Sequence, residues 1–187
     1  GKFYIGRRAR QRIITMKIAV TGANSSVGQN LLAQITTQDK ITVVAGVRSE
    51  QAKASLPHSP RIETRIISYD DSAGLAKLFT SVDSVVHLAG ILMENRQTSY
   101  ASANVAATAA VVQAAKHSAV KHLVFISVIG ADATADNAYF RSKGCAEKLV
   151  VESGISASII RTPILLGRGT AGAKALLGAA SQTKIKI

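Results

Sequence analysis

The chain has 187 residues, a net charge of +12, 47% hydrophobic residues and 18% charged residues. This composition excludes an intrinsically disordered chain and fits a single folded domain with a full core. The single cysteine, Cys145, excludes an intrachain disulfide, and no apolar run reaches the roughly 18 residues that span a bilayer. We identify no set of candidate metal ligands.

Residues 1–15 contain five basic residues and no acidic one. Because Met16 begins a segment that looks like a natural start, we expect residues 1–15 to lie outside the fold and residues 16–187 to form the domain. In that case the protein is expected to be cytoplasmic. Alternatively, the arginine-rich start is a transit peptide for the mitochondrion or a plastid. The other basic residues form no stripe with interleaved aromatics, so no nucleic-acid partner is expected.

The first predicted strand, Lys17–Val20, runs through a glycine-containing turn into a predicted helix, Ser26–Thr36. The first turn of a helix presents unpaired N–H groups, and glycine lets a ligand approach the backbone closely. The turn therefore predicts a phosphate site, although turns of this kind also occur as plain connections. The candidate binding residues are Gly22, Asn24, Ser25, Ser26, Val27 and Gly28.

Apolar strand-like runs then alternate with helix-like segments. Most of these runs are continuous in Val, Ile and Leu, which is typical of strands buried on both faces of a parallel sheet. The pattern predicts a doubly wound α/β fold with strand order 3-2-1-4-5-6 and a ligand at the switch point. The later strands are expected at Ile41–Val47, Arg61–Ile67, Ser84–Leu88, His122–Ile126 and Ala157–Arg161, and the later helices at Ser49–Ala54, Asp71–Thr80, Ser99–His117 and Tyr139–Ser153.

The end of the chain contains a short helix-like segment, Ala173–Ala180, and a strand-like segment, Lys184–Ile187. No closing signal follows them. We therefore expect a cofactor domain from which a substrate-binding C-terminal part has been removed.

Arg48 and Ser49 follow the second predicted strand, where a dinucleotide fold places the adenosine ribose. An acid at this point would favour NAD, whereas a guanidinium and a hydroxyl suit the 2′-phosphate of NADP. The sequence therefore predicts NADP, with NAD less favoured; the alternative for Arg48 is a solvated surface side chain.

Two further strand ends carry candidate cofactor contacts. Asp70, after the third strand, either accepts a hydrogen bond from the adenine amino group or caps the next helix. The small residues that follow the fourth strand let the backbone approach a cofactor, whereas His87, within that strand, is expected to be structural. The candidate contacts there are Leu88, Ala89 and Gly90.

Tyr139 and Lys143 are four residues apart and share one face of a predicted helix. A nearby ammonium lowers the pKa of a phenol, so that the tyrosine can give or take the proton that accompanies hydride transfer. We therefore predict that Tyr139 and Lys143 are catalytic and also contact the cofactor.

From Met16 to about Gly169, these ordered motifs resemble the short-chain dehydrogenase/reductase superfamily. The extended and atypical branches are most similar: NAD-dependent epimerase/dehydratase-like proteins, NmrA-like regulators and the NAD(P)H-binding accessory subunit of respiratory complex I. The resemblance implies a Rossmann fold with further cofactor contacts at Asn104, Thr162 and Pro163. The matching segments are Thr21–Gly28, Val85–Gly90, Asn104–Thr108, Leu123–Gly130, Tyr139–Lys143 and Arg161–Gly169.

Two positions depart from the family pattern. Ser25 stands where the turn usually has glycine, and Val128 stands where extended members have their active-site serine or threonine. Ser127 is the candidate third catalytic residue, but adjacent strand residues point in opposite directions, so it would need a bulge.

The resemblance leaves two functions open. One is an NADP-dependent oxidoreductase, epimerase or dehydratase acting on a carbonyl or alcohol carbon of an unknown small molecule. The other is a non-catalytic NAD(P)H-binding redox sensor or structural subunit. Either protein would work as a homo-oligomer or within a larger complex.

Overall fold

The computed structural model describes residues 15–165, 170, 172–173 and 177–178. Its six strands form one parallel sheet in the order β3-β2-β1-β4-β5-β6, which confirms the predicted topology. Residues 1–14, most of Ala173–Ala180 and all of Lys184–Ile187 lie outside the described residues. The strands are β1 (Met16–Thr21), β2 (Ile41–Val47), β3 (Ile62–Ile66), β4 (Ser84–His87), β5 (His122–Val128) and β6 (Ser156–Thr162).

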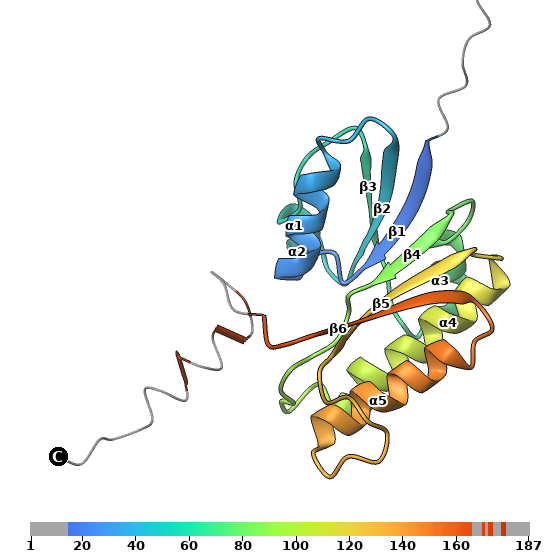
Figure 1. The fold of residues 1–187 in the computed structure, drawn as a ribbon. Coiled ribbons are helices and arrows are strands. Elements are labelled where there is room, and N and C mark those ends of the chain that lie inside the picture. Colours follow the sequence, from blue (N-terminus) through green and yellow to red (C-terminus); the bar gives the residue numbers. More distant parts are fainter. Residues whose placement is uncertain (1–14, 166–169, 171, 174–176, 179–187) are drawn as a thin grey trace, which may run out of the picture.

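Helices cover the two faces of the sheet, with α1 and α2 on one face and α3, α4 and α5 on the other (Figure 1). Each layer has its own apolar core: Leu32 and Ile35 of α1 pack with Val20 and Val43, while Val111 and Phe125 lie in the core beneath the other helices. Burying each such side chain contributes about 1.5–3 kcal/mol. The helices are α1 (Ser26–Ile35), α2 (Glu50–Ala54), α3 (Ser72–Leu78), α4 (Ala107–His117) and α5 (Ala138–Val151).

The single helix expected over Ser99–His117 is instead two segments. A π-helical segment, η1 (Ala101–Ala106), leads directly into α4. Within it, the buried Asn104 amide accepts a hydrogen bond from Ile91 N at 2.8 Å and donates to Ile91 O at 3.2 Å. Over six residues, an apolar pattern does not distinguish a π-helical turn from an α-helical one, so the sequence did not reveal this change.

A buried hydrogen-bond chain joins the end of β1 to α4 through His87. The His87 ring is fully enclosed; its Nδ1 lies 2.6 Å from Thr21 Oγ1, and its Nε2 lies 3.1 Å from Thr108 Oγ1. Because Thr108 donates its one proton to Asn104 O, Nε2 must donate to Thr108 and Nδ1 must accept from Thr21. Burial lowers the pKa of His87 to about 3, so the ring is neutral and serves the structural role that we expected.

Candidate functional site

The turn after β1 depends on glycine at two positions. Gly22 has a φ of +69°, and a Cβ placed on it would lie 2.6 Å from Ala89 N. A Cβ on Gly28 would clash with the carbonyl of Ala23. These two glycines therefore hold the start of α1 tightly against the ends of β1 and β4.

The N-terminus of α1 keeps two backbone donors free. Ser25 is the N-cap, and its Oγ accepts a hydrogen bond from Gly28 N at 3.0 Å. Within the described part of the chain, the amides of Ser26 and Val27 have no hydrogen-bond partner. The departure at Ser25 thus supplies a helix cap, while two N–H groups and the helix dipole remain available to an anion.

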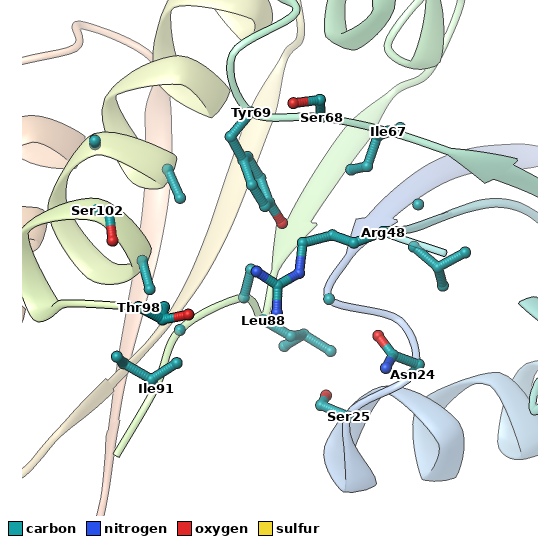
Figure 2. Close-up of a pocket in the computed structure, with 18 of the residues that line it drawn as sticks. Asn24, Ser25, Arg48, Ile67, Ser68, Tyr69, Leu88, Ile91, Thr98 and Ser102 are labelled. Carbon is teal, nitrogen blue, oxygen red and sulfur yellow. The ribbon is translucent and has the colours of Figure 1, made fainter. Parts of the chain in front are cut away.

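A cavity of about 530 Å³ opens beside this turn, at the carboxyl ends of β1, β2, β3 and β4 (Figure 2). Its volume is within the range of small-molecule and cofactor sites. Its lining includes the following eight residues, six at or just after strand ends and two in the loop that precedes η1, so segments far apart in the sequence surround one space. Those residues are Gly22, Arg48, Tyr69, Asp70, Ala89, Gly90, Gln97 and Thr98.

Arg48 supplies a free positive charge to this cavity. Its side chain extends into the cavity (Figure 2), and among the described residues it forms no ion pair or hydrogen bond. Burial raises the pKa of the Tyr69 hydroxyl to about 12, although Thr21 and the charge of Arg48 act in the opposite direction. The Tyr69 hydroxyl is therefore protonated and can donate a hydrogen bond.

We considered two roles for Asp70, helix capping and adenine binding, and the structure assigns the capping role to Asp71. Asp71 is the N-cap of α3, with its Oδ1 accepting from Gly74 N at 2.9 Å, whereas Asp70 lines the cavity. The capping alternative for Asp70 is therefore wrong, and its contact with adenine stays a prediction.

A second cavity, of about 190 Å³, shares the Leu88–Ile91 wall with the first. Its lining includes Tyr139, Lys143 and, from β5, Val128. Thr162 and Pro163 close it at the end of β6. A ligand that follows the shared wall would reach from the α1 N-terminus to Tyr139.

Tyr139 presents a free hydroxyl. The side chain is half-buried, its ring centroid lies 5.7 Å from that of Tyr100, and its hydroxyl has no hydrogen-bond partner in the described ranges. Burial, followed by the effect of Tyr100, raises the pKa of Tyr139. No lowering by Lys143 accompanies these two effects, and the Lys143 ammonium is hydrogen-bonded to Ile126 O.

Lys143 is 7% exposed, and its Nζ donates to Ile126 O at 2.8 Å. The same Nζ lies 4.3 Å from the centroid of the Phe125 ring, within the range of a cation–π contact. Burial lowers the pKa of Lys143 to about 8, with Glu147 opposing the shift. Only one of its three donors is used by Ile126, so the group can also hydrogen-bond a ligand.

β5 continues without a bulge past Ser127, since Ser127 pairs with Arg161 and Val128 pairs with Thr162. Ser127 Oγ is enclosed and makes no hydrogen bond to the described residues. The geometric condition that we set for a catalytic Ser127 is thus not met in this structure, and its catalytic role stays a prediction without a supporting contact.

Every predicted site residue except Gly28 lines one of the two cavities. Gly28 instead packs against the backbone of Ala23 within the turn. Asn104 lines the second cavity, but its amide is engaged by Ile91 and, at 2.9 Å, by Ser142 Oγ. Sequence reasoning missed Tyr69, whose signal was its place directly after a strand. It also missed Gln97 and Thr98, for which the loop sequence offered no signal.

Two negative observations apply to the described part of the chain. None of its helices has both the length and the apolar character needed to cross a bilayer. It also contains no cluster of three His, Cys, Asp or Glu side chains able to hold a metal ion.

A protein-family model described as NAD(P)H-binding matches residues 22–186. Among curated proteins, the chain is 29% identical over 157 residues to UDP-2-acetamido-2,6-beta-L-arabino-hexul-4-ose reductase from Pseudomonas aeruginosa. That match covers 82% of this chain and 37% of the relative, so the chain spans well under half of the relative's length.

Solved structures share the fold at low sequence identity. The Bordetella bronchiseptica enzyme WbmH in complex with NAD⁺ has a TM-score of 0.72 at 19% identity, with 89% of this chain and 62% of that chain covered. UDP-glucuronic acid 4-epimerase from Bacillus cereus, in complex with UDP-glucuronic acid and NAD, has a TM-score of 0.66 at 22% identity, with 78% and 56% covered.

Proposed function

The chain belongs to the NAD(P)H-binding family, and from this premise we propose that it binds NADP(H) and acts on a carbonyl or alcohol carbon as an oxidoreductase or epimerase-like protein. The expected resemblance to the short-chain dehydrogenase/reductase superfamily is confirmed at the level of family and fold. A nicotinamide dinucleotide extending over the two cavities would supply or accept hydride. Tyr139 would give or take the accompanying proton.

The residues present fit such a cofactor. The Cβ-free surface of Gly22 faces Ala89, two amides of α1 are free, and the unpaired Arg48 points into the larger cavity. These groups are suited to a diphosphate and a 2′-phosphate. Gly22 and Arg48, with the amides of Ser26 and Val27, would hold the phosphates, while Lys143 would hydrogen-bond the ribose near Tyr139.

The observation that carries the proposal is the wall shared by the two cavities. Leu88, Ala89, Gly90 and Ile91 line both the cavity that contains Arg48 and the cavity that contains Tyr139. Ser26 and Val27 line the second of these cavities. One extended ligand could therefore contact a phosphate site and the candidate acid–base group together. An isolated phosphate pocket or a surface tyrosine would not give this arrangement.

Replacing Arg48 with alanine is expected to weaken NADPH binding about 10- to 100-fold, since a hydrogen bond to a charged group contributes about 1.5–3 kcal/mol. NADH binding should be nearly unchanged because NADH has no 2′-phosphate. Calorimetric titration of both cofactors measures the difference. Arg65→Ala is the matched control, because Arg65 is exposed and ion-paired with Glu63 outside the cavities.

Equal affinity of the wild-type protein for the two cofactors, unchanged in Arg48→Ala, would contradict the NADP assignment. That result would still be consistent with a nicotinamide dinucleotide as the ligand.

A second candidate function is a non-catalytic NAD(P)H-binding sensor or structural subunit. Val128 favours it, because a buried valine cannot donate a hydrogen bond to a carbonyl beside Tyr139. Stable retention in a multiprotein complex, with no turnover and with intact function in Tyr139→Phe, would support this candidate over catalysis.

A further inference from the structure

The second cavity combines a single charged side chain with a mainly apolar wall. Among its described lining residues, Lys143 alone carries a charge, and its Nζ already donates to Ile126 O at 2.8 Å. Aliphatic side chains from separate segments line the same space, including Leu92 after β4, Val128 of β5 and Ile164 after β6. A ligand held here therefore contacts an apolar surface.

The polar side chains of this cavity offer a ligand few hydrogen bonds. The Asn104 amide is engaged within the protein, and Thr162 Oγ1 donates to Ser127 O at 3.3 Å. Ser127 Oγ is itself almost fully enclosed. The Tyr139 hydroxyl can bind one carbonyl oxygen, whereas a ligand with many hydroxyl groups would leave most of them without partners among the described residues.

Four exposed apolar side chains lie at the same cavity. Ile164 and Leu165 line it, Met93 directly follows the lining residue Leu92, and Ile129 directly follows the last residue of β5. Met93 is 65% exposed, Ile129 61% and Ile164 59%. Single exposed apolar side chains are ordinary, but a group that three segments contribute beside one cavity indicates a ligand-binding surface. We call these four residues the apolar rim.

Contacts with the rest of the fold hold the apolar rim in place. The carbonyl of Leu92, next to Met93, accepts a hydrogen bond from the Tyr100 hydroxyl at 2.9 Å. The backbone N–H of Ile129 donates to the last carbonyl of β6 at 3.0 Å. A Cβ on Gly172 would lie 2.5 Å from Cγ2 of Ile164, so these two segments pack closely. The apolar rim is therefore part of the folded site.

We propose that the substrate of this site is a small carbonyl or alcohol compound with an aliphatic or aromatic body, and not a nucleotide sugar. The inference rests on the proposed function, because it names the substrate class of the same site. The carbonyl oxygen accepts a hydrogen bond from Tyr139, and the apolar body lies against Leu92, Val128 and the apolar rim. In reduction, the carbonyl carbon receives hydride from NADPH and its oxygen receives the proton of Tyr139, which gives the alcohol and NADP⁺. Tyr139 regains its proton from water.

The distribution of positive charge supports the same substrate class. A nucleotide sugar carries its own diphosphate, which needs cationic partners in addition to those that hold the cofactor. Arg48 lies in the first cavity and is assigned to the cofactor, while Lys143 is enclosed and bound to Ile126 O. The described lining of the second cavity contains no other cationic side chain.

A matched pair of ketones tests the substrate class. Cyclohexanone and pentahydroxycyclohexanone share a ring and a carbonyl, but the second has a hydroxyl group on every other ring carbon. Binding is measured by saturation-transfer NMR with and without NADP⁺, and turnover by nicotinamide absorbance. We expect cyclohexanone to have a kcat/KM at least about 10-fold higher, because unpaired hydroxyl groups are costly to bury. Equal or tighter binding of the hydroxylated ketone, or of UDP-glucuronic acid, would overturn the proposal.

Cyclohexanones with a ring alkyl chain of increasing length test the apolar rim. Each added methylene should tighten binding about two- to fourfold while the chain lies on the rim. Met93→Gln and Ile164→Asn should reduce this gain, and both side chains are exposed, so the fold should be retained. The matched controls are Met16→Gln and Ile66→Asn, which replace exposed residues that line neither cavity. Affinity that does not depend on chain length, or that changes equally in the controls, would contradict a role of the rim.

The same measurements separate this inference from the proposed function. Turnover of the hydroxylated ketone in preference to cyclohexanone supports an oxidoreductase and overturns the apolar substrate class alone. Binding of the alkyl ketones without any turnover supports the inference and contradicts catalysis. If no apolar ketone binds, with or without NADP⁺, the inference is wrong whatever the affinity for the cofactor.

Discussion

We expect replacement of Tyr139 with phenylalanine to lower the rate of the proposed NADPH-dependent carbonyl reduction by about 10²- to 10⁴-fold, the range that general acid catalysis contributes. The substitution removes only the hydroxyl, which has no hydrogen-bond partner among residues that the structure describes. Folding and NADPH affinity should therefore change little. Turnover is measured by nicotinamide absorbance with a panel of carbonyl compounds, alongside calorimetric titration of NADPH.

Tyr100→Phe is the matched control. The Tyr100 ring packs against that of Tyr139, but its hydroxyl donates to Leu92 O at 2.9 Å and lines neither cavity. Its loss should cost about 1 kcal/mol of stability and leave turnover near the wild-type rate. Equal turnover in Tyr139→Phe and the wild-type protein would show that another group moves the proton.

Replacing Gly22 with alanine should destabilise the fold by about 3 kcal/mol or more and abolish measurable NADPH binding. The left-handed φ of Gly22 costs an alanine about 1–2 kcal/mol, and the new Cβ would also lie 2.6 Å from Ala89 N and 2.9 Å from Leu88 C. Because both contacts are with backbone, the turn itself must move away from β4. Urea unfolding and NADPH titration measure the two effects.

Gly154→Ala is the control that distinguishes the backbone strain of a left-handed φ from the steric clash of the added Cβ. Gly154 has a φ of +75°, close to that of Gly22, but nothing lies within 4 Å of its added Cβ. Its substitution should therefore cost only the left-handed strain of about 1–2 kcal/mol and leave NADPH binding intact. If the two alanine variants lose equal stability and bind NADPH equally well, close packing of Gly22 against Ala89 is not what shapes the site.

The two substitutions address different parts of one site. Gly22 packs against the backbone of Leu88 and Ala89 at the proposed phosphate end, and Tyr139 has its hydroxyl at the proposed acid–base end. The Leu88–Ile91 wall joins these ends. Loss of turnover with intact NADPH binding in Tyr139→Phe, and loss of binding in Gly22→Ala, would support one ligand extending over both cavities.

Local sequence predicted those features that depend on neighbours in the chain. The continuous Val and Ile runs indicated buried parallel strands, and the strand order follows the predicted topology. Strand ends differed by one or two residues, as at Val128, because a strand ends where its partner stops pairing. The glycine turn, Arg48 and the Tyr139–Lys143 pair were found because each is a short motif beside a strand or within one helix.

The sequence by itself determined the fold class, the order of the strands, the glycine turn and the spacing of Tyr139 and Lys143. Only the tertiary structure decided how Lys143 is held and that the Ser127 hydroxyl is enclosed without a hydrogen-bond partner among the described residues. The register that pairs Ser127 with Arg161 places that arginine opposite Glu147, 14 residues earlier on another element. Such a contact depends on both strand register and helix packing. Neither can be recognised from the periodic pattern of apolar residues in the sequence.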